Sequence, residues 1–427
     1  MSGFTRVPSD GRERLAARQS TMRSHNLALV MHHISQQGPT SRARIASALG
    51  LTKATVSALA DELLRAALLV ELAPEPGPGV GRRGQPLALN PQGPSGIGLE
   101  INVDHVTVCL MDLTGTVRHE DVLRADNRGR SPRRVLADSA PLVRRALELA
   151  RGDGLDVMGL EVAVPGIVAS DTGRLLRAPN LGWSDVGLGV LLREVLELPG
   201  LPVGVGNEAD LAALGELWFG GGAEWGDFIH VTGEVGVGAG LVFGNRLFRG
   251  AHGYAGEFGH MTVQRRGPLC RCGARGCLEV FAGQEAILRA AGLAHVPGTR
   301  HGGPPGSVPA LRMLVHQGEA RALQAVEAAG EKLGVALSGL VNVLDPDTVV
   351  LGGLYAVLAP WLVRPLTREL EHRLVVEREM ETLVRVSRLP GDAAARGAAG
   401  AVVRRLIAEP ATSRGPQGPP RGGPTAD

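Results

Sequence analysis

The chain has 427 residues, of which 44% are hydrophobic and 21% are charged, a composition typical of proteins that bury a core in two or three domains. No apolar run approaches the ~18 residues of a membrane helix, and no apolar signal core follows the N-terminal charges, so we expect a cytoplasmic protein without a membrane partner. Glycine and proline cluster only at turns and at the C-terminal end, which excludes a fibrous or largely disordered protein.

Basic residues are concentrated near the N-terminus. Residues 1–60 carry eight basic side chains against two acidic ones, although the formal net charge of the whole chain is +2. This asymmetry is typical of a nucleic-acid-binding head on a neutral body. A solvated tail explains the charges from Arg6 to Arg18 equally well, so residues 1–20 are predicted to form a flexible basic tail.

Residues 21–92 are predicted to contain three short helices. Apolar residues between Leu27 and Ile34 recur at the spacing of one helix face. Ser41 and Thr52 are predicted to cap the starts of the second and third helices, and Gly50 ends the second one. Such a pair of helices joined by a tight turn indicates a helix-turn-helix unit, with the third helix in the DNA groove.

Two short apolar segments follow the helices. Residues 68–72 and 85–89 are predicted strands, and the Pro/Gly-rich stretch between them carries two arginines at its tip, as in the wing of a winged helix. A small three-helix domain with no DNA role is the alternative. The residues predicted to contact a double-stranded DNA operator are Arg42, Thr52, Lys53, Thr55, Ser57, Arg82 and Arg83.

Residues 96–408 are predicted to form an α/β body, because short apolar runs alternate with longer helical stretches. Residues 135–150 and 322–341 are examples of those helical stretches. Residues 409–427 are rich in proline and glycine and lack apolar periodicity, so we expect a disordered tail.

A histidine and three cysteines indicate a metal site. Three of the four cysteines of the chain lie within eight residues, and a histidine precedes them by ten positions. The predicted ligands are His260, Cys270, Cys272 and Cys277. Three thiolates and one imidazole match the tetrahedral preference of structural Zn²⁺, and a disulfide is the weaker alternative in a reducing compartment. Cys109 lies in an apolar run and is predicted to be a core side chain.

These motifs resemble the ROK family of sugar kinases and repressors. The resemblance rests on residues 178–183, 205–216, 256–260 and 270–279, and runs from about residue 98 to about residue 406. It implies an actin-like, ribonuclease H-like body of two lobes, a sugar or sugar phosphate in the cleft, and a homodimer or homotetramer. The implied sugar ligands are Asn180, Asn207, Glu208, Glu257, His260 and Glu279. Residues 81–86 resemble the wing of the family's repressor branch.

The chain departs from the kinase pattern of that family in three places. The first phosphate loop of a kinase would read Asp-x-Gly-Gly-Thr, whereas residues 100–104 read Glu-Ile-Asn-Val-Asp. Glu234-Val235 stands where the second loop would have Gly-Thr, and Glu208 stands at the position of the catalytic Asp. Lost glycines and added acids disfavour a polyphosphate, so we expect no catalytic residue and no kinase activity.

Two functions from different classes follow from the resemblance. The favoured hypothesis is a sugar-responsive transcriptional regulator, a repressor, with a degenerate kinase body. The alternative is an active, glucokinase-like sugar kinase that uses ATP and carries an accessory DNA-binding head. A third hypothesis is a regulator whose pocket has lost its ligand and whose body serves only for dimerisation.

Overall fold

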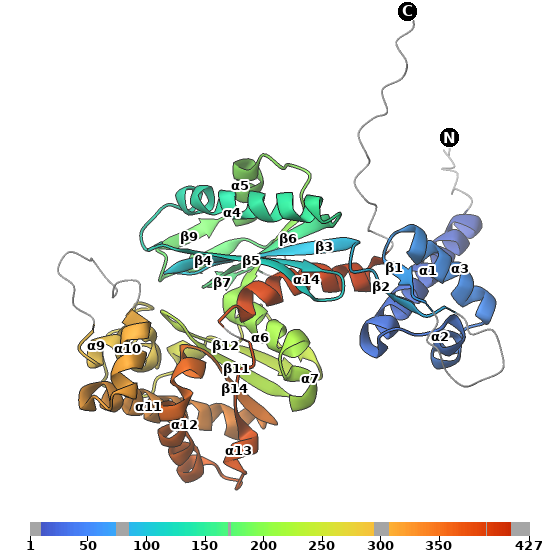
Figure 1. Ribbon diagram of the computed structural model, residues 1–427. Helices are drawn as coiled ribbons and strands as arrows, with labels where there is room; N and C mark the ends of the chain where they lie inside the picture. The colour runs from blue at the N-terminus through green and yellow to red at the C-terminus, as the bar shows by residue number, and fades with distance from the viewer. Residues whose placement is uncertain (1–9, 74–84, 170–171, 294–306, 390, 411–427) are drawn as a thin grey trace, which may run out of the picture.

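The computed structural model describes residues 10–73, 85–169, 172–293, 307–389 and 391–410. These residues form an N-terminal head, which lies beside a larger two-lobed body (Figure 1). No helix among them has the length and apolar character needed to span a membrane.

The head has the winged-helix arrangement that the sequence predicts. Its elements are α1 (Asp10–Gln37), α2 (Arg42–Leu49), α3 (Lys53–Arg65), β1 (Leu69–Glu71) and β2 (Leu87–Leu89). Ser41 and Thr52 are the N-caps of α2 and α3, and their side chains accept hydrogen bonds from backbone N–H groups. Strands β1 and β2 pair antiparallel.

One prediction for the head is wrong at its start. The predicted flexible tail includes residues 10–20, but α1 begins at Asp10 and continues to Gln37. The helix starts early because the polar residues of this segment are compatible with helix propensity, although they lack the apolar periodicity that the prediction used. Residues 1–9 and 411–427, the remainder of the two predicted tails, lie outside the described residues.

The body contains two five-stranded sheets with the same topology. The first has the order β10-β6-β3-β4-β5 and the second β13-β12-β11-β14-β15. In each sheet three strands form an antiparallel meander, and two further strands add parallel to its first strand. This repeated unit confirms the two-lobed, ribonuclease H-like α/β fold.

The strands of the first lobe are β3 (Pro94–Ile101), β4 (His105–Asp112), β5 (Val117–Arg124), β6 (Asp156–Val164) and β10 (Val203–Asn207). A small sheet beside it consists of β7 (Ile167–Val168), β8 (Leu175–Ala178) and β9 (Trp183–Val186). The strands of the second lobe are β11 (Phe228–Gly233), β12 (Val237–Phe243), β13 (Arg246–Leu247), β14 (Thr348–Gly353) and β15 (Val384–Val386).

Helices cover both lobes. They are α4 (Pro132–Gly152), α5 (Leu188–Leu196), α6 (Glu208–Phe219), α7 (Gly222–Trp225), η1 (Phe258–His260), α8 (Glu279–Ala282), α9 (Gln284–Ala290), α10 (Ser307–His316), α11 (Ala320–Leu344), α12 (Leu354–Arg373), α13 (Met380–Leu383) and α14 (Ala393–Ala408). Helix α14 packs on β3, β4 and α6 and reaches α1 of the head (Figure 1).

Head and body share one hydrophobic core at this contact. Met31 and Ile34 of α1 belong to the same buried cluster as Met111 of β4 and Val403 and Ile407 of α14. Each of these side chains is at most 4% exposed. The head is therefore attached to the body by apolar packing as well as by the chain. Cys109 is completely buried in this cluster, as predicted for a core cysteine.

Candidate functional site

A cavity of about 180 Å³ lies between the two lobes. All six residues that the family resemblance implies as sugar ligands line it: Asn180, Asn207, Glu208, Glu257, His260 and Glu279. The first three come from the β8–β9 turn and the β10–α6 junction, and the others from the segment between β13 and α9. Amides and carboxylates from opposite walls can divide the donors and acceptors of neighbouring hydroxyl groups between them.

Two of these residues begin helices. Asn207 is the N-cap of α6, because its Oδ1 accepts a hydrogen bond from the Asp210 N–H at 3.0 Å. Its Nδ2 donates to the Gly166 carbonyl at 2.8 Å. The amide therefore already has one partner on each atom, and it can offer a ligand one further N–H and one further lone pair. Glu279 is the first residue of α8.

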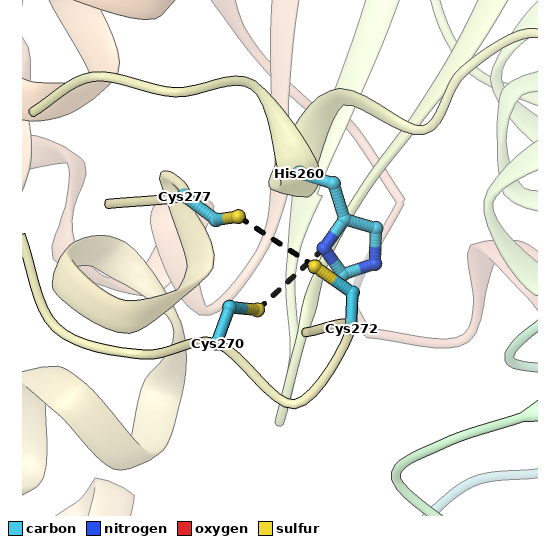
Figure 2. Close-up of side chains that lie close together, drawn as sticks. All are labelled: His260, Cys270, Cys272 and Cys277. Carbon is cyan, nitrogen blue, oxygen red and sulfur yellow. Dashed lines mark hydrogen bonds between the residues drawn. The ribbon is translucent and has the colours of Figure 1, made fainter. Parts of the chain in front are cut away.

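The predicted metal ligands converge into one cluster (Figure 2). The ligand atoms of His260, Cys270, Cys272 and Cys277 all lie within 4.8 Å of one another. The Sγ atoms of Cys272 and Cys277 are 3.7 Å apart, as are Cys270 Sγ and His260 Nδ1. Zinc–sulfur bonds of about 2.3 Å in a tetrahedron separate neighbouring sulfurs by about 3.8 Å. The donor set and its spacing therefore fit a tetrahedral metal ion.

The imidazole of His260 faces both the metal cluster and the cavity. Its Nδ1 lies beside Cys270, and its Nε2 is 3.8 Å from Oε2 of Glu257, which lines the cavity. Burial raises the pKa of the Glu257 carboxyl, although the nearby histidine opposes this shift. One side chain thus connects the cluster to the wall of the cavity.

Buried carboxylates occupy the region where a kinase would bind phosphates. Glu100 and Glu208 are 2% and 7% exposed. Burial, reinforced by the charges of Glu100 and Glu234, raises the pKa of Glu208 well above its ordinary value. Burial also raises the pKa of Glu234 to about 8, with His105 opposing and Asp104 reinforcing the shift. A phosphate group here would meet several acids.

His105 is the cation at the centre of this acidic cluster. Its Nδ1 is 2.7 Å from Asp104 Oδ1, and its Nε2 is 3.2 Å from Glu100 Oε1. Burial alone would lower the pKa of the imidazole, but the hydrogen bonds to the two carboxylates outweigh it and raise the pKa to about 11. The histidine therefore carries a positive charge at neutral pH and partly neutralises the cluster.

Backbone N–H groups of residues 100–104, the segment in the position of the first phosphate loop, already donate hydrogen bonds within the protein. The Asn102 N–H donates to the His105 carbonyl, and the Val103 N–H donates to the side chain of Asn102 at 2.7 Å. The Val103 side chain is only 1% exposed. These N–H groups are therefore used within the segment and are not presented to an anion.

Four of the seven residues predicted to contact DNA lie at the start of α3. Thr52 and Lys53 are exposed, whereas Thr55 and Ser57 are half-buried. Arg42 is the first residue of α2. Its guanidinium forms ion pairs with Glu71 at 2.6 Å and with Asp61 at 3.2 Å. Arg82 and Arg83, the predicted tip of the wing, lie outside the described residues.

Sequence reasoning missed two arginines that line the cavity, Arg177 of β8 and Arg271 of the cysteine segment. Arg271 donates from Nη1 to Asn180 Oδ1 at 3.0 Å, across the cavity. Arg271 and Asn180 are 91 residues apart, so no local sequence pattern predicts their contact. The sequence indicates only that Arg271 lies between two predicted metal ligands, Cys270 and Cys272.

Comparison with known proteins agrees with these features. A sequence model described as the ROK family matches residues 96–405. The chain is 33% identical over 394 residues to a protein named putative xylose repressor from Caldicellulosiruptor sp. (strain Rt8B.4), and the alignment covers 90% of this chain and 97% of that relative.

Two solved structures have the same fold. One is described as a ROK family transcriptional regulator, a homolog of the E. coli MLC protein, and matches with a TM-score of 0.74 at 23% identity over 91% of this chain and 97% of that one. The other is a ROK family glucokinase from Streptomyces griseus in complex with glucose and AMPPNP, with a TM-score of 0.60 at 26% identity over 72% of this chain and 98% of that one. Nearly the whole glucokinase is therefore matched, but about a quarter of this chain has no counterpart in it.

Proposed function

Since this chain belongs to the ROK family, we propose that it is a sugar-responsive transcriptional repressor that has lost sugar kinase activity. The observation that carries this proposal is the contrast within the cleft between the lobes. The cavity keeps all six positions that the resemblance implies as sugar ligands, while buried acids fill the adjoining phosphate-loop segments. The match to a relative named putative xylose repressor over nearly its whole length supports the same conclusion.

The environment of Glu208 supports the proposed loss of catalysis. A general base must be deprotonated to accept the proton of an attacking hydroxyl. Burial and the charges of Glu100 and Glu234 raise the pKa of Glu208 and so disfavour its deprotonated form, and the neighbouring acids disfavour a nucleotide. An active sugar kinase with a DNA-binding head is the second candidate, favoured by the likeness to the glucokinase. ATP-dependent formation of a sugar phosphate at about 1 s⁻¹ or faster would establish that candidate.

We further propose that Zn²⁺ is the resident metal of the cysteine cluster. Three sulfur donors and one imidazole nitrogen select zinc over hard cations such as Mg²⁺ or Ca²⁺. The ion would be structural, since the four protein ligands close the tetrahedron. It would fix the segment that carries Glu257 and Glu279 and thereby shape one wall of the cavity.

The sugar effector and the DNA operator communicate through helices in this proposal. Asn207 and Glu208 form the start of α6, which packs along α14. Helix α14 in turn contacts α1 and shares its hydrophobic core. A sugar that shifts the start of α6 would therefore move the head, and in a homodimer or homotetramer this would change the spacing of the two recognition helices.

The test is a DNA-binding titration with and without sugar. An operator is first selected from a random pool of double-stranded DNA, and sugars are screened by thermal shift, starting with xylose, glucose and N-acetylglucosamine. We expect the bound sugar to weaken operator binding by about 1–3 kcal/mol at fixed salt concentration. Saturating sugar that leaves operator affinity unchanged would refute the allosteric part of the proposal.

Two variants separate the two sites in this experiment. Glu257→Ala should abolish the response to sugar and leave operator affinity intact, because Glu257 lines the cavity and lies far along the chain from the head. Lys53→Ala combined with Arg83→Ala should weaken operator binding and leave sugar binding intact. Loss of both activities in either variant would contradict separate sites.

A further inference from the structure

Arg271 bridges the two lobes at the rim of the sugar cavity. It lies between Cys270 and Cys272, on the second lobe, and its Nη1 donates to Oδ1 of Asn180, on the first lobe, at 3.0 Å. Its Nη2 donates to Oε2 of Glu285 at 3.0 Å. One guanidinium therefore binds a cavity-lining amide and, at the same time, an acid at the start of α9.

A second arginine continues this bridge back to the first lobe. Arg128 pairs with Oε1 of Glu285 at 3.1 Å, and the two side chains are only 13% and 16% exposed. The chain of contacts therefore joins the two lobes at two points. One is the contact of Arg271 with Asn180, and the other is the contact of Glu285 with Arg128. Because the Arg128–Glu285 pair is shielded from water, it is screened less by salt than a surface pair and holds Glu285 in place for Arg271.

The contact with Arg271 determines how the Asn180 amide is oriented. A guanidinium only donates hydrogen bonds, so the atom of Asn180 that faces it must be the oxygen. The amide nitrogen then faces the opposite way, toward Glu279. Both groups lie close to Gly236. A Cβ atom added there would be 2.5 Å from Glu279 Oε2 and 3.0 Å from Asn180 Nδ2, so the amide nitrogen and the carboxylate oxygen are near each other.

We infer that Arg271 is a positioning residue for ligand recognition: it fixes the Asn180 amide so that its N–H donors stand beside the Glu279 acceptor. This inference rests on the proposed function, because it takes the cavity as a sugar site. A donor and an acceptor side by side match a pair of adjacent sugar hydroxyls, one of which accepts a hydrogen bond while the other donates one. Arg271 also ties the metal-binding segment to the opposite wall of the cavity.

The test compares sugar affinities in Arg271→Gln, Arg271→Lys and the wild type. The probes are xylose, glucose and N-acetylglucosamine, measured by calorimetry on the full-length protein. We expect Arg271→Gln to weaken binding of the preferred sugar by about tenfold. Arg271→Lys should recover part of the loss, because an ammonium group supplies a donor but not the planar fork that reaches Asn180 and Glu285 together. Arg275→Gln is the control: it removes an exposed arginine of the same segment, with no ion pair among the described residues, and should bind as the wild type does.

A double-mutant cycle distinguishes positioning from general damage. If Arg271 acts through Asn180, then Arg271→Gln should have little further effect in an Asn180→Ala background. Metal content and sugar-free operator affinity should match the wild type in both single variants. Additive losses, a loss of metal in Arg271→Gln, or unchanged sugar affinity would each overturn the inference while leaving the proposed function standing. A wild type that binds none of the three sugars would refute the proposed sugar site itself and this inference with it.

Discussion

Gly397 on α14 lies directly against the backbone carbonyl of Leu211 on α6, so closely that a Cβ at position 397 would lie 1.7 Å from that oxygen. Gly215 of α6 makes the reciprocal approach, since its Cβ would lie 2.3 Å from the Ala393 carbonyl. The two helices therefore touch backbone to backbone. Any side chain at these points must push apart the helix that begins at the cavity between the lobes and the helix that reaches the head.

Gly397→Ala is predicted to weaken the link between sugar and operator. Alanine in a helix interior is ordinarily more stable than glycine by about 1 kcal/mol. Here the added methyl must displace α6, so we expect a net destabilisation of about 1–3 kcal/mol, measured by denaturant unfolding. The effect of sugar on operator affinity should shrink in the same variant.

Gly152→Ala is the matched control for this experiment. Gly152 ends α4, and a Cβ there would meet nothing within 4 Å. This variant should unfold like the wild type or slightly later, with full coupling between the two ligands. If Gly397→Ala behaved in the same way, helix contact would not be the route between the sites.

Removal of the metal is predicted to loosen the segment that forms one wall of the cavity and to reduce sugar affinity. Cys277→Ser should lower the zinc content from one ion per chain to near zero and reduce sugar affinity, because the segment with Glu257 and Glu279 loses its cross-link. Elemental analysis and calorimetry report the two effects. Cys109→Ser changes a buried cysteine outside the cluster and should keep its zinc. Full sugar binding by a metal-free, folded protein would contradict a structural role.

Stability is predicted to fall as the pH rises from about 6 to about 9. The folded pKa of Glu234, about 8, and that of His105, about 11, both lie above the ordinary values of 4.5 and 6.5. A raised folded pKa means that the folded state binds the proton more tightly, so the stability that it contributes is lost as the pH rises through the folded pKa. The melting temperature should drop by several degrees across this range.

Glu234→Gln provides the check on this pH dependence. The amide cannot ionise, so the variant should lose part of the slope between pH 7 and 9, with ionic strength held constant. An unchanged slope would show that Glu234 is not the group that titrates in this window. His105→Asn should instead be destabilised at neutral pH, since Asp104 and Glu100 would lose the cation between them.

Lys53 and Arg42 are predicted to behave differently although both are basic residues of the head. Lys53→Ala should weaken operator binding and reduce the slope of log affinity against log salt by about 1, because an exposed cation at the start of α3 neutralises one phosphate. Arg42→Ala should leave that slope almost unchanged. Its main effect should be a small loss of head stability, of at most about 1 kcal/mol, since its charge is already paired with Glu71 and Asp61.

Local signals in the sequence predicted the parts of the molecule that depend on near neighbours. Ser41 and Thr52 cap helices because a hydroxyl needs only the N–H groups two or three residues ahead. The metal cluster could be predicted for the same reason, since its four ligands lie within one short segment. The family resemblance supplied the cavity residues, which no spacing rule would have brought together.

The parts that escaped prediction depend on contacts between distant segments. The acids of residues 100–104 are visible in the sequence, but the positive charge on His105 arises from its hydrogen bonds to Asp104 and Glu100, which outweigh the opposite effect of burial. The bridge from Arg271 to Asn180 exists only because the two lobes face each other. The ion pairs of Arg42 with Glu71 and Asp61 likewise join separate elements of the head, and its contact with DNA stays a prediction.

The core shared by α1 and α14 also limits how the head can be exchanged or removed. A chain cut between β2 and β3 would leave Val403, Leu406 and Ile407 of α14 without the face of α1 that covers them, and such a headless body should aggregate. A chimera with the head of another regulator would need a first helix with the same apolar contour, or an α14 taken from the same donor.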